Sequence, residues 1–186
     1  MSTLKLVMAT SRDGIVSLGP DDDMLWTGES DKKAFRLLTS VGGVLGAGRR
    51  TFENLPVLKG RTVRCLSHRR GRVAHPQPKQ SYCLDGEAVA NGTYASSEML
   101  TLDEFAQQFP QGWLIGGQTV ALEALASKQV NEVFMCRAPI DLRYEVRLAT
   151  TFQQDSMTPW LRVNARWTQT DEFTVGDTRI EVWRFK

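Results

Sequence analysis

Long apolar runs, histidines and paired cysteines are all scarce in this sequence of 186 residues. Its three cysteines, Cys65, Cys83 and Cys136, are odd in number and widely spaced, and only two histidines accompany them. This pattern argues against a disulfide framework and against a zinc site. No apolar stretch reaches the roughly 18 residues of a transmembrane helix, and the apolar run after Met1 is too short for a signal peptide. We therefore expect a cytoplasmic protein without a metal site or a membrane partner.

A strong excess of one charge sign is also missing. The formal net charge is +2, which gives no argument for a nucleic-acid partner, although arginines cluster between Arg61 and Arg72. Hydrophobic residues make up 41% of the chain and charged residues 24%, as in ordinary globular proteins. A chain of this length buries one core, so we expect a single domain over residues 1–186, acting as a monomer.

Strand and helix patterns alternate along much of the chain. Short apolar runs predict strands, periodic apolar stripes predict helices, and Thr101-Leu-Asp-Glu104 is a capping box. The predicted strands are 4–9, 44–45, 61–66, 82–84, 112–115, 130–136, 167–173 and 180–185, and the predicted helices are 29–39, 49–55, one that begins at 101, and 119–126. This order predicts an α/β fold with a central, mostly parallel sheet, helices on both faces and an antiparallel C-terminal hairpin. Ligands are expected at the strand ends.

One carboxylate interrupts the apolar face of the first predicted helix. Asp31 shares that face with Ala34, Phe35 and Leu38, which follow it at i+3, i+4 and i+7. A buried carboxylate should be hydrogen-bonded, have a raised pKa, or both, as a proton-delivering acid requires. The alternative is a solvated acid near the positive end of the helix dipole. The polar loop Ser17–Asp23 before this helix is typical of a mobile lid.

Two strand–glycine–helix junctions offer backbone N–H groups to an anion. They are Val44-Leu-Gly-Ala-Gly48-Arg-Arg-Thr51 and Leu114-Ile-Gly-Gly117-Gln-Thr-Val120. Neither matches a Walker loop or a G-x-G-x-x-G fingerprint, so for each alone a plain glycine turn is the simpler interpretation. Two such junctions in one small sheet indicate a dinucleotide. His68, Arg69 and Arg70 would hold an extra phosphate or form a solvated basic loop. No G-x-S-x-G sequence accompanies either histidine, which argues against a triad hydrolase.

Several short motifs follow one another in order along the chain. They are Met24-Leu-Trp26 with Asp31 and Phe35 after it, Gly48-Arg-Arg-Thr51-Phe-Glu53, Lys59-Gly-Arg61 and Ile115-Gly-Gly117. The ordered set resembles the dihydrofolate reductase family from Leu4 to Phe185. The resemblance implies reduction of 7,8-dihydrofolate by NADPH, which supplies tetrahydrofolate for one-carbon metabolism and thymidylate synthesis. Asp31 would hold the pterin ring and support protonation of N5, Trp26 would order a water beside it, and Arg61 would pair with the substrate's glutamate carboxylate.

The resemblance also implies which residues bind each molecule. The implied substrate contacts are Val7, Met8, Ala9, Phe35, Leu55, Leu58, Arg61, Ile115 and Cys136. The implied cofactor contacts are Ala9, Val16, Gly48, Arg49, Arg50, Thr51, Ser67, His68, Arg69, Gly116, Gly117, Gln118 and Thr119. Among the latter, Ser67, His68 and Arg69 would lie near the adenosine 2′-phosphate, which favours NADPH over NADH.

The chain departs from the family's pattern close to the expected site. Cys136 stands where the family often has a threonine bonded to the acid, and Ala121 stands where it has a tyrosine near the nicotinamide. The loop 141–152 lacks the usual Gly-Asp that pairs with the lid. Two alternatives therefore stay open: a reductase of the same fold acting on a pyrimidine, against which Asp31, Trp26 and Arg61 weigh, and a binding or structural protein without turnover.

Overall fold

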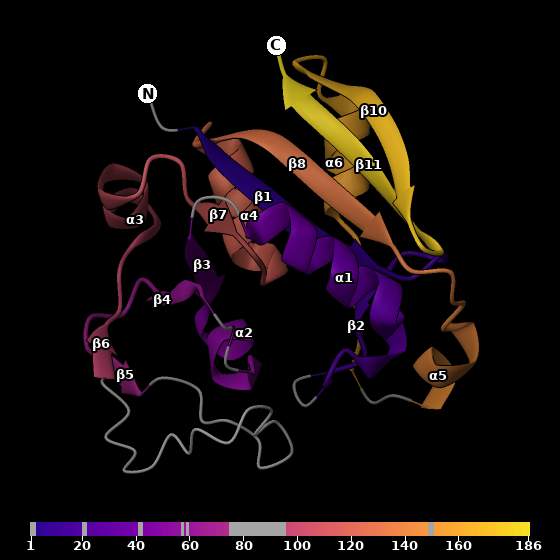
Figure 1. Ribbon diagram of the computed structural model, residues 1–186, viewed down its shortest axis with the longest axis horizontal. Coiled ribbons are helices and arrows are strands. Elements are labelled where there is room, and N and C mark those ends of the chain that lie inside the picture. Colours follow the sequence, from indigo (N-terminus) through magenta and orange to yellow (C-terminus); the bar gives the residue numbers. More distant parts are fainter. Residues whose placement is uncertain are drawn as a thin grey trace.

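A seven-stranded mixed sheet lies at the centre of the computed structural model, which describes residues 3–19, 22–40, 43–56, 58, 60–74, 96–148 and 151–186 (Figure 1). The strand order is β10-β11-β8-β1-β7-β3-β4. The strands are β1 (Leu4–Thr10), β3 (Val44–Gly48), β4 (Thr62–Leu66), β7 (Trp113–Leu114), β8 (Val130–Arg137), β10 (Trp167–Val175) and β11 (Thr178–Phe185). Neighbours from β8 to β4 pair in parallel, whereas β11 is antiparallel to both β8 and β10. The expected α/β class, the mostly parallel sheet and the antiparallel hairpin are confirmed.

Helices cover both faces of this sheet, because alternate residues of each strand point to opposite sides. In β1, Leu4 and Leu6 belong to one apolar cluster, and Val7 belongs to another. The helices are α1 (Gly28–Thr39), α2 (Arg49–Asn54), α3 (Leu102–Gln108), α4 (Gln118–Ala126), α5 (Arg143–Leu148) and α6 (Met157–Val163). Side chains of α3, α4 and α6 fill the first cluster, and those of α1 and α2 fill the second, so we name them the α4-side core and the α1-side core. No helix in the described ranges is long and apolar enough to cross a membrane.

The first predicted glycine junction begins later than expected, because Gly46 lies within β3 and not in a turn. A Cβ atom built on Gly46 would lie 2.9 Å from Leu66 Cδ1, 3.0 Å from Phe105 Cζ and 3.1 Å from Leu114 Cδ2. A side chain at this position would therefore force the side chains of Leu66, Phe105 and Leu114 to shift. Gly46 therefore allows α3 to pack closely on the sheet. From the sequence alone, a glycine with this role cannot be distinguished from a glycine in a turn.

Several short elements escaped prediction. The segment 141–152 was expected to be a loop, which is wrong over α5. Six mostly exposed residues are too few to show a helical period, and Asp141 starts the helix by accepting a bond from the Arg143 backbone N–H at 3.1 Å. The unpredicted strands form two small pairs, β2 (Ile15–Ser17) with β9 (Gln153–Gln154) and β5 (Arg72–Ala74) with β6 (Ser96–Glu98). The predicted strand 82–84 lies outside the described residues.

The capping box predicted at Thr101 is present at the start of α3. Thr101 Oγ1 accepts a bond from the Glu104 backbone N–H at 3.2 Å, and Glu104 Oε2 accepts one from the Thr101 N–H at 2.8 Å. Replacing Thr101 with alanine should lower the free energy of unfolding by about 1 kcal/mol, measured by urea denaturation. Ser156→Ala is the matched control, because Ser156 is the N-cap of α6 and makes no side-chain cap bond. Equal losses in the two variants would contradict this assignment.

Candidate functional site

Asp31 lies in the first turn of α1 and has only 9% of its surface exposed. Burial raises the pKa of Asp31 to about 6, against the opposing effects of a hydrogen bond from Thr27 and the charge of Lys32. A carboxyl group with this pKa exchanges its proton at about pH 6, nearer to neutrality than an ordinary aspartate, which suits a general acid. Asp31 is therefore buried and perturbed, and the alternative of a solvated acid is wrong.

Cys136 is a residue of β8 that lies close enough to Asp31 on α1 to be affected by its charge. Its side chain is 1% exposed and belongs to the α1-side core. Burial, followed by the charge of Asp31, raises the pKa of the Cys136 thiol far above its ordinary value. The thiol therefore stays neutral. Ala121, which stands where the family has a tyrosine, lies on α4 and is 1% exposed. It packs within the α4-side core, on the other face of the sheet from Asp31.

The apolar residues expected to contact substrate gather mainly at the α1-side core. Those that belong to it or pack against it are Val7, Ala9, Phe35, Leu55, Leu58, Ile115 and Cys136. The structure does not bring Met8 to this face: its side chain lies in the α4-side core, because it alternates with Val7 along β1. Val16, expected at the cofactor, also packs into the α4-side core. The sequence did not show that Met8 and Val16 lie on the opposite face of the sheet from the other expected apolar contacts.

Arg61 lies across the far end of α1 from Asp31. Its Nη1 atom donates to Thr39 Oγ1 at 2.8 Å, and the guanidinium lies 5.5 Å from the ring centroid of Phe35. Burial and the charge of Arg36 lower the pKa of Arg61. Within the described ranges, no carboxylate forms an ion pair with Arg61. The guanidinium is thus held in place with its charge available for an anion.

The two glycine junctions lie side by side at the carboxyl ends of β3 and β7. Gly48 N donates to Gly116 O at 3.0 Å, and Gly117 N donates to Thr51 Oγ1 at 3.0 Å. Gly48 and Gly117 are the N-caps of α2 and α4, and neither helix has a side-chain cap bond. First-turn N–H groups of both helices are therefore open to an anionic ligand. The Gly117 N–H was expected to bind the cofactor, but in the structure it already donates to Thr51 Oγ1.

Several expected phosphate ligands already have partners within the protein. The contacts are Arg49 Nε to Glu53 Oε1 at 2.8 Å, His68 Nε2 to Glu123 Oε2 at 3.1 Å, Ser67 Oγ to Arg69 N at 3.0 Å, and Gln118 Oε1 to Ser156 N at 2.9 Å. The side chains of Arg50, Arg69 and Thr119 are exposed. A phosphate bound here would compete with Glu53 for Arg49 and with Glu123 for His68.

The expected lid is organised by one of its aspartates. Asp22 accepts bonds from the backbone N–H groups of Leu18 at 2.7 Å and Met24 at 2.9 Å. It also binds the Trp26 indole, whose Nε1 atom lies 3.2 and 3.1 Å from its two carboxylate oxygens. Trp26 therefore donates its indole N–H to Asp22. Residues 20 and 21 of the lid lie outside the described residues.

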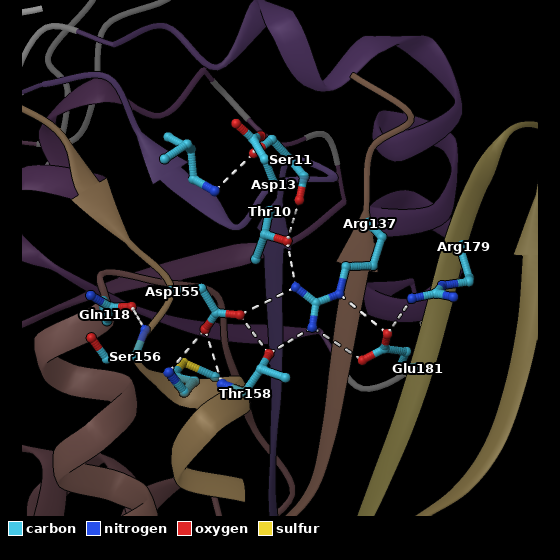
Figure 2. Close-up of polar contacts among 12 residues, drawn as sticks. Thr10, Ser11, Asp13, Gln118, Arg137, Asp155, Ser156, Thr158, Arg179 and Glu181 are labelled. Carbon is cyan, nitrogen blue, oxygen red and sulfur yellow. Dashed lines mark hydrogen bonds and ion pairs between the residues drawn. The ribbon is translucent and has the colours of Figure 1, made fainter. Parts of the chain in front are cut away.

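A buried charge cluster around Arg137 was not predicted from the sequence (Figure 2). Arg137 binds Glu181 through Nε at 3.3 Å and Nη2 at 3.2 Å, and Asp155 through Nη1 at 3.2 Å. It also donates to Thr10 Oγ1 at 2.8 Å and Thr158 Oγ1 at 2.7 Å. The three charged side chains are 13%, 3% and 5% exposed for Arg137, Glu181 and Asp155. The only signals in the sequence were Arg137 at the end of the apolar strand β8 and Glu181 inside the apolar strand β11.

The Arg137 cluster joins β1, β8, β11 and the start of α6. Thr10 directly follows Ala9, and Arg137 directly follows Cys136, so the cluster fixes the two strand ends that carry expected substrate contacts. Burial alone would raise the pKa of Glu181, but hydrogen bonds and charges from Arg137 and Arg179 lower it below its usual value. All five hydrogen-bond donors of the guanidinium point into this network. Its arrangement indicates a structural role close to the site.

Comparisons with known proteins add no family assignment. No protein-family profile matches this sequence, and no curated protein matches it. Within the part of the chain that the structure describes, no group of three or more His, Cys, Asp or Glu side chains could hold a metal ion.

Proposed function

We propose that this protein is a dihydrofolate reductase that uses NADPH, with the fold that this family shares. The observation that carries the proposal is a buried carboxyl group, Asp31, whose pKa is raised to about 6. It lies against an apolar core whose strand ends also carry two adjacent glycine junctions. An acid of this kind beside an anion-binding edge fits a reaction that needs one proton and one hydride. The same geometry gives no reason to favour a pyrimidine substrate.

The residues of this chain would act by binding, orientation and proton supply. Asp31 would hold the amidine-like edge of the pterin ring and support protonation at N5. Phe35, Leu55, Leu58 and Ile115 would exclude water from the bound ring. Trp26 would have to exchange its bond with Asp22 for a water beside the substrate. Arg61 would bind the glutamate carboxylate at the other end of α1.

The described residues fit a dinucleotide with phosphates. Gly48 and Gly117 are the N-caps of two adjacent helices without side-chain caps, so first-turn N–H groups of both helices could meet a phosphate. Arg49, Arg50 and Thr119 would add side-chain donors, and His68 with Arg69 would face the 2′-phosphate. NADPH, when bound, would supply the hydride.

A purified sample mixed with NADPH and dihydrofolate tests the proposal through the loss of NADPH absorbance. Oxidation that needs both compounds is expected, with NADH as a poorer donor. Folded protein that oxidises no NADPH would overturn the proposal. Binding of both compounds without oxidation would favour the non-catalytic alternative, and oxidation with a pyrimidine substrate alone would favour the other reductase.

Arg61→Ala should weaken dihydrofolate binding by about 10- to 100-fold, as expected for loss of a hydrogen-bonded charge. NADPH affinity should be unchanged, because Arg61 contacts α1 and not the glycine junctions. Arg50→Ala is the matched control with the opposite expectation, weaker NADPH binding and unchanged dihydrofolate binding. Isothermal titration with each compound measures both. A loss of NADPH affinity in Arg61→Ala would contradict the position assigned to the substrate.

A further inference from the structure

The loop of residues 67–71 follows β4 and lies beside the first glycine junction. Leu66, the last residue of β4, pairs with Gly48, the last residue of β3, so the loop begins next to the start of α2. In the strand order β8-β1-β7-β3-β4, Asp31 lies close to β8, the two junctions follow β7 and β3, and this loop follows β4. A dinucleotide with its reacting ring near Asp31 and its diphosphate at the junctions would therefore bring its adenosine to the loop.

Two of the three basic side chains in this loop are paired with acids of neighbouring helices. Arg70 Nη1 lies 2.7 Å from Glu104 Oε1 on α3, and His68 Nε2 lies 3.1 Å from Glu123 Oε2 on α4. Arg69, between them, has an exposed side chain, and within the described ranges no carboxylate forms an ion pair with it. An anion bound between His68 and Arg69 would therefore meet one free cation and the Glu123 carboxylate.

Glu123 lies on α4, the helix that begins at the second junction, and it was not predicted as a site residue. Its contact with His68 is at the surface, because the side chains of His68 and Glu123 are 79% and 37% exposed. Surface ion pairs of this kind contribute little to stability. The consequence of the contact therefore concerns a ligand at the loop and not the folding of the chain.

The contact with Glu123 uses a hydrogen-bond donor that a phosphate would need. A carboxylate only accepts hydrogen bonds, so His68 Nε2 must carry a proton. A neutral histidine has one N–H donor, and Glu123 already takes it. A phosphate at His68 would also lie close to the negative charge of Glu123, and like charges repel. A ribose hydroxyl could instead donate to the second oxygen of Glu123, Oε1, as in NAD-binding sites of doubly wound folds.

We propose that Glu123 is a specificity-determining residue, which disfavours a phosphate on the adenosine ribose and so reduces the preference for NADPH over NADH. The inference rests on the proposed function for the presence of a dinucleotide at this edge. Arg69 attracts the 2′-phosphate of NADPH, whereas Glu123 repels it and accepts a hydrogen bond from the 2′-hydroxyl of NADH. The preference between the two nucleotides is then the balance of an attractive and a repulsive charge.

Glu123→Gln keeps the size of the side chain and an oxygen that can accept from His68, but it removes the charge. The dissociation constant for NADPH should fall by about 5- to 10-fold, as expected when a like charge is removed at close range from a surface site. The dissociation constant for NADH should not fall. Isothermal titration with each nucleotide at low ionic strength, where surface charges are least screened, measures both.

Glu53→Gln is the matched control, because it makes the same change in net charge. Glu53 Oε1 accepts from Arg49 Nε at 2.8 Å, at the junction where the diphosphate common to both nucleotides would lie. Any change in this variant should affect NADPH and NADH equally, so the ratio of their dissociation constants should stay at the wild-type value. An unchanged ratio in folded Glu123→Gln, or an equal change of the ratio in both variants, would overturn the proposal.

The binding measurements contain no dihydrofolate, so they separate this inference from the proposed function. If the ratio changes only in Glu123→Gln while the wild type oxidises neither nucleotide with dihydrofolate, the proposed function fails and the role of Glu123 stands. If the wild type oxidises NADPH with dihydrofolate and the ratio does not change, the role of Glu123 fails alone. Folded wild-type protein that binds neither nucleotide would overturn both.

Discussion

Asp31→Asn should lower kcat for dihydrofolate reduction at pH 7 by roughly 10²- to 10⁴-fold, the contribution expected of a positioned acid. The wild-type rate should fall as the pH rises through about 6, because Asp31 then loses its proton. The variant should lack this midpoint, and its rate should recover partly at low pH, where solvent protonates the substrate. Steady-state kinetics across this pH range provide the measurement.

Glu29→Gln is the matched control for Asp31→Asn. Glu29 lies in the same helical turn, but its side chain is 90% exposed and pairs with Lys32. Its replacement should leave both the rate and the pH profile unchanged. A variant Asp31→Asn with a wild-type profile would remove Asp31 from the mechanism.

Asp31→Asn should also make the protein more stable, although it lowers the activity. The pKa of Asp31 is raised in the folded state, so ionisation opposes folding, and the penalty is fully present above about pH 6 and absent below the ordinary value of 3.8. Asparagine carries no such penalty. The free energy of unfolding should therefore rise by about 3 kcal/mol at pH 8, with the gain vanishing near pH 4. Loss of activity without this gain would indicate that Asp31 is ionised at little cost.

The central strands of the sheet were predictable because they are largely buried. Continuous apolar runs identified β1 and β8, and the capping box identified the start of α3. Elements that depend on contacts between distant segments were not predictable, and the strand pair β2 and β9, which joins Ile15 to Gln154, is one of them. The helix α5 was missed for a different reason, because it is too short to show a helical period. The role of Gly46 could not be predicted either, because the side chains that approach it come from β4, α3 and β7, which are distant in the sequence.

The site was predictable where one residue carried the signal on its own. Asp31 stood out because a carboxylate interrupts an apolar helix face, and its burial and raised pKa follow from that position. The partners of a polar side chain were harder to foresee. Asp22 was read as one acid in a polar loop, and its bond to Trp26 became visible only in the folded chain.

Arg137→Met should cause the largest loss of stability, about 3–5 kcal/mol in the free energy of unfolding. Methionine keeps much of the volume but leaves Asp155 buried without its cation and leaves Glu181 with only its ion pair to Arg179 at 2.7 Å. The two carboxylates are 5% and 3% exposed. The loss should be greatest at neutral pH. Without Arg137, burial would raise the pKa of Glu181, so the deficit should shrink as the pH falls below about 4.5, where carboxylates become neutral.

Arg184→Met is the matched control for this prediction, because Arg184 lies on the same strand pair and also contacts two carboxylates. Its ion pairs with Glu132 and Asp171, both at 2.8 Å, lie at the surface, and its side chain is 50% exposed. Surface pairs of this kind contribute about 0–1 kcal/mol, so this variant should unfold near the wild-type midpoint in urea. Equal losses in the two variants would show that the buried cluster adds no more than a surface pair. A larger loss in Arg137→Met, with a pH dependence that Arg184→Met lacks, would establish that buried charges hold together the strand ends next to Ala9 and Cys136.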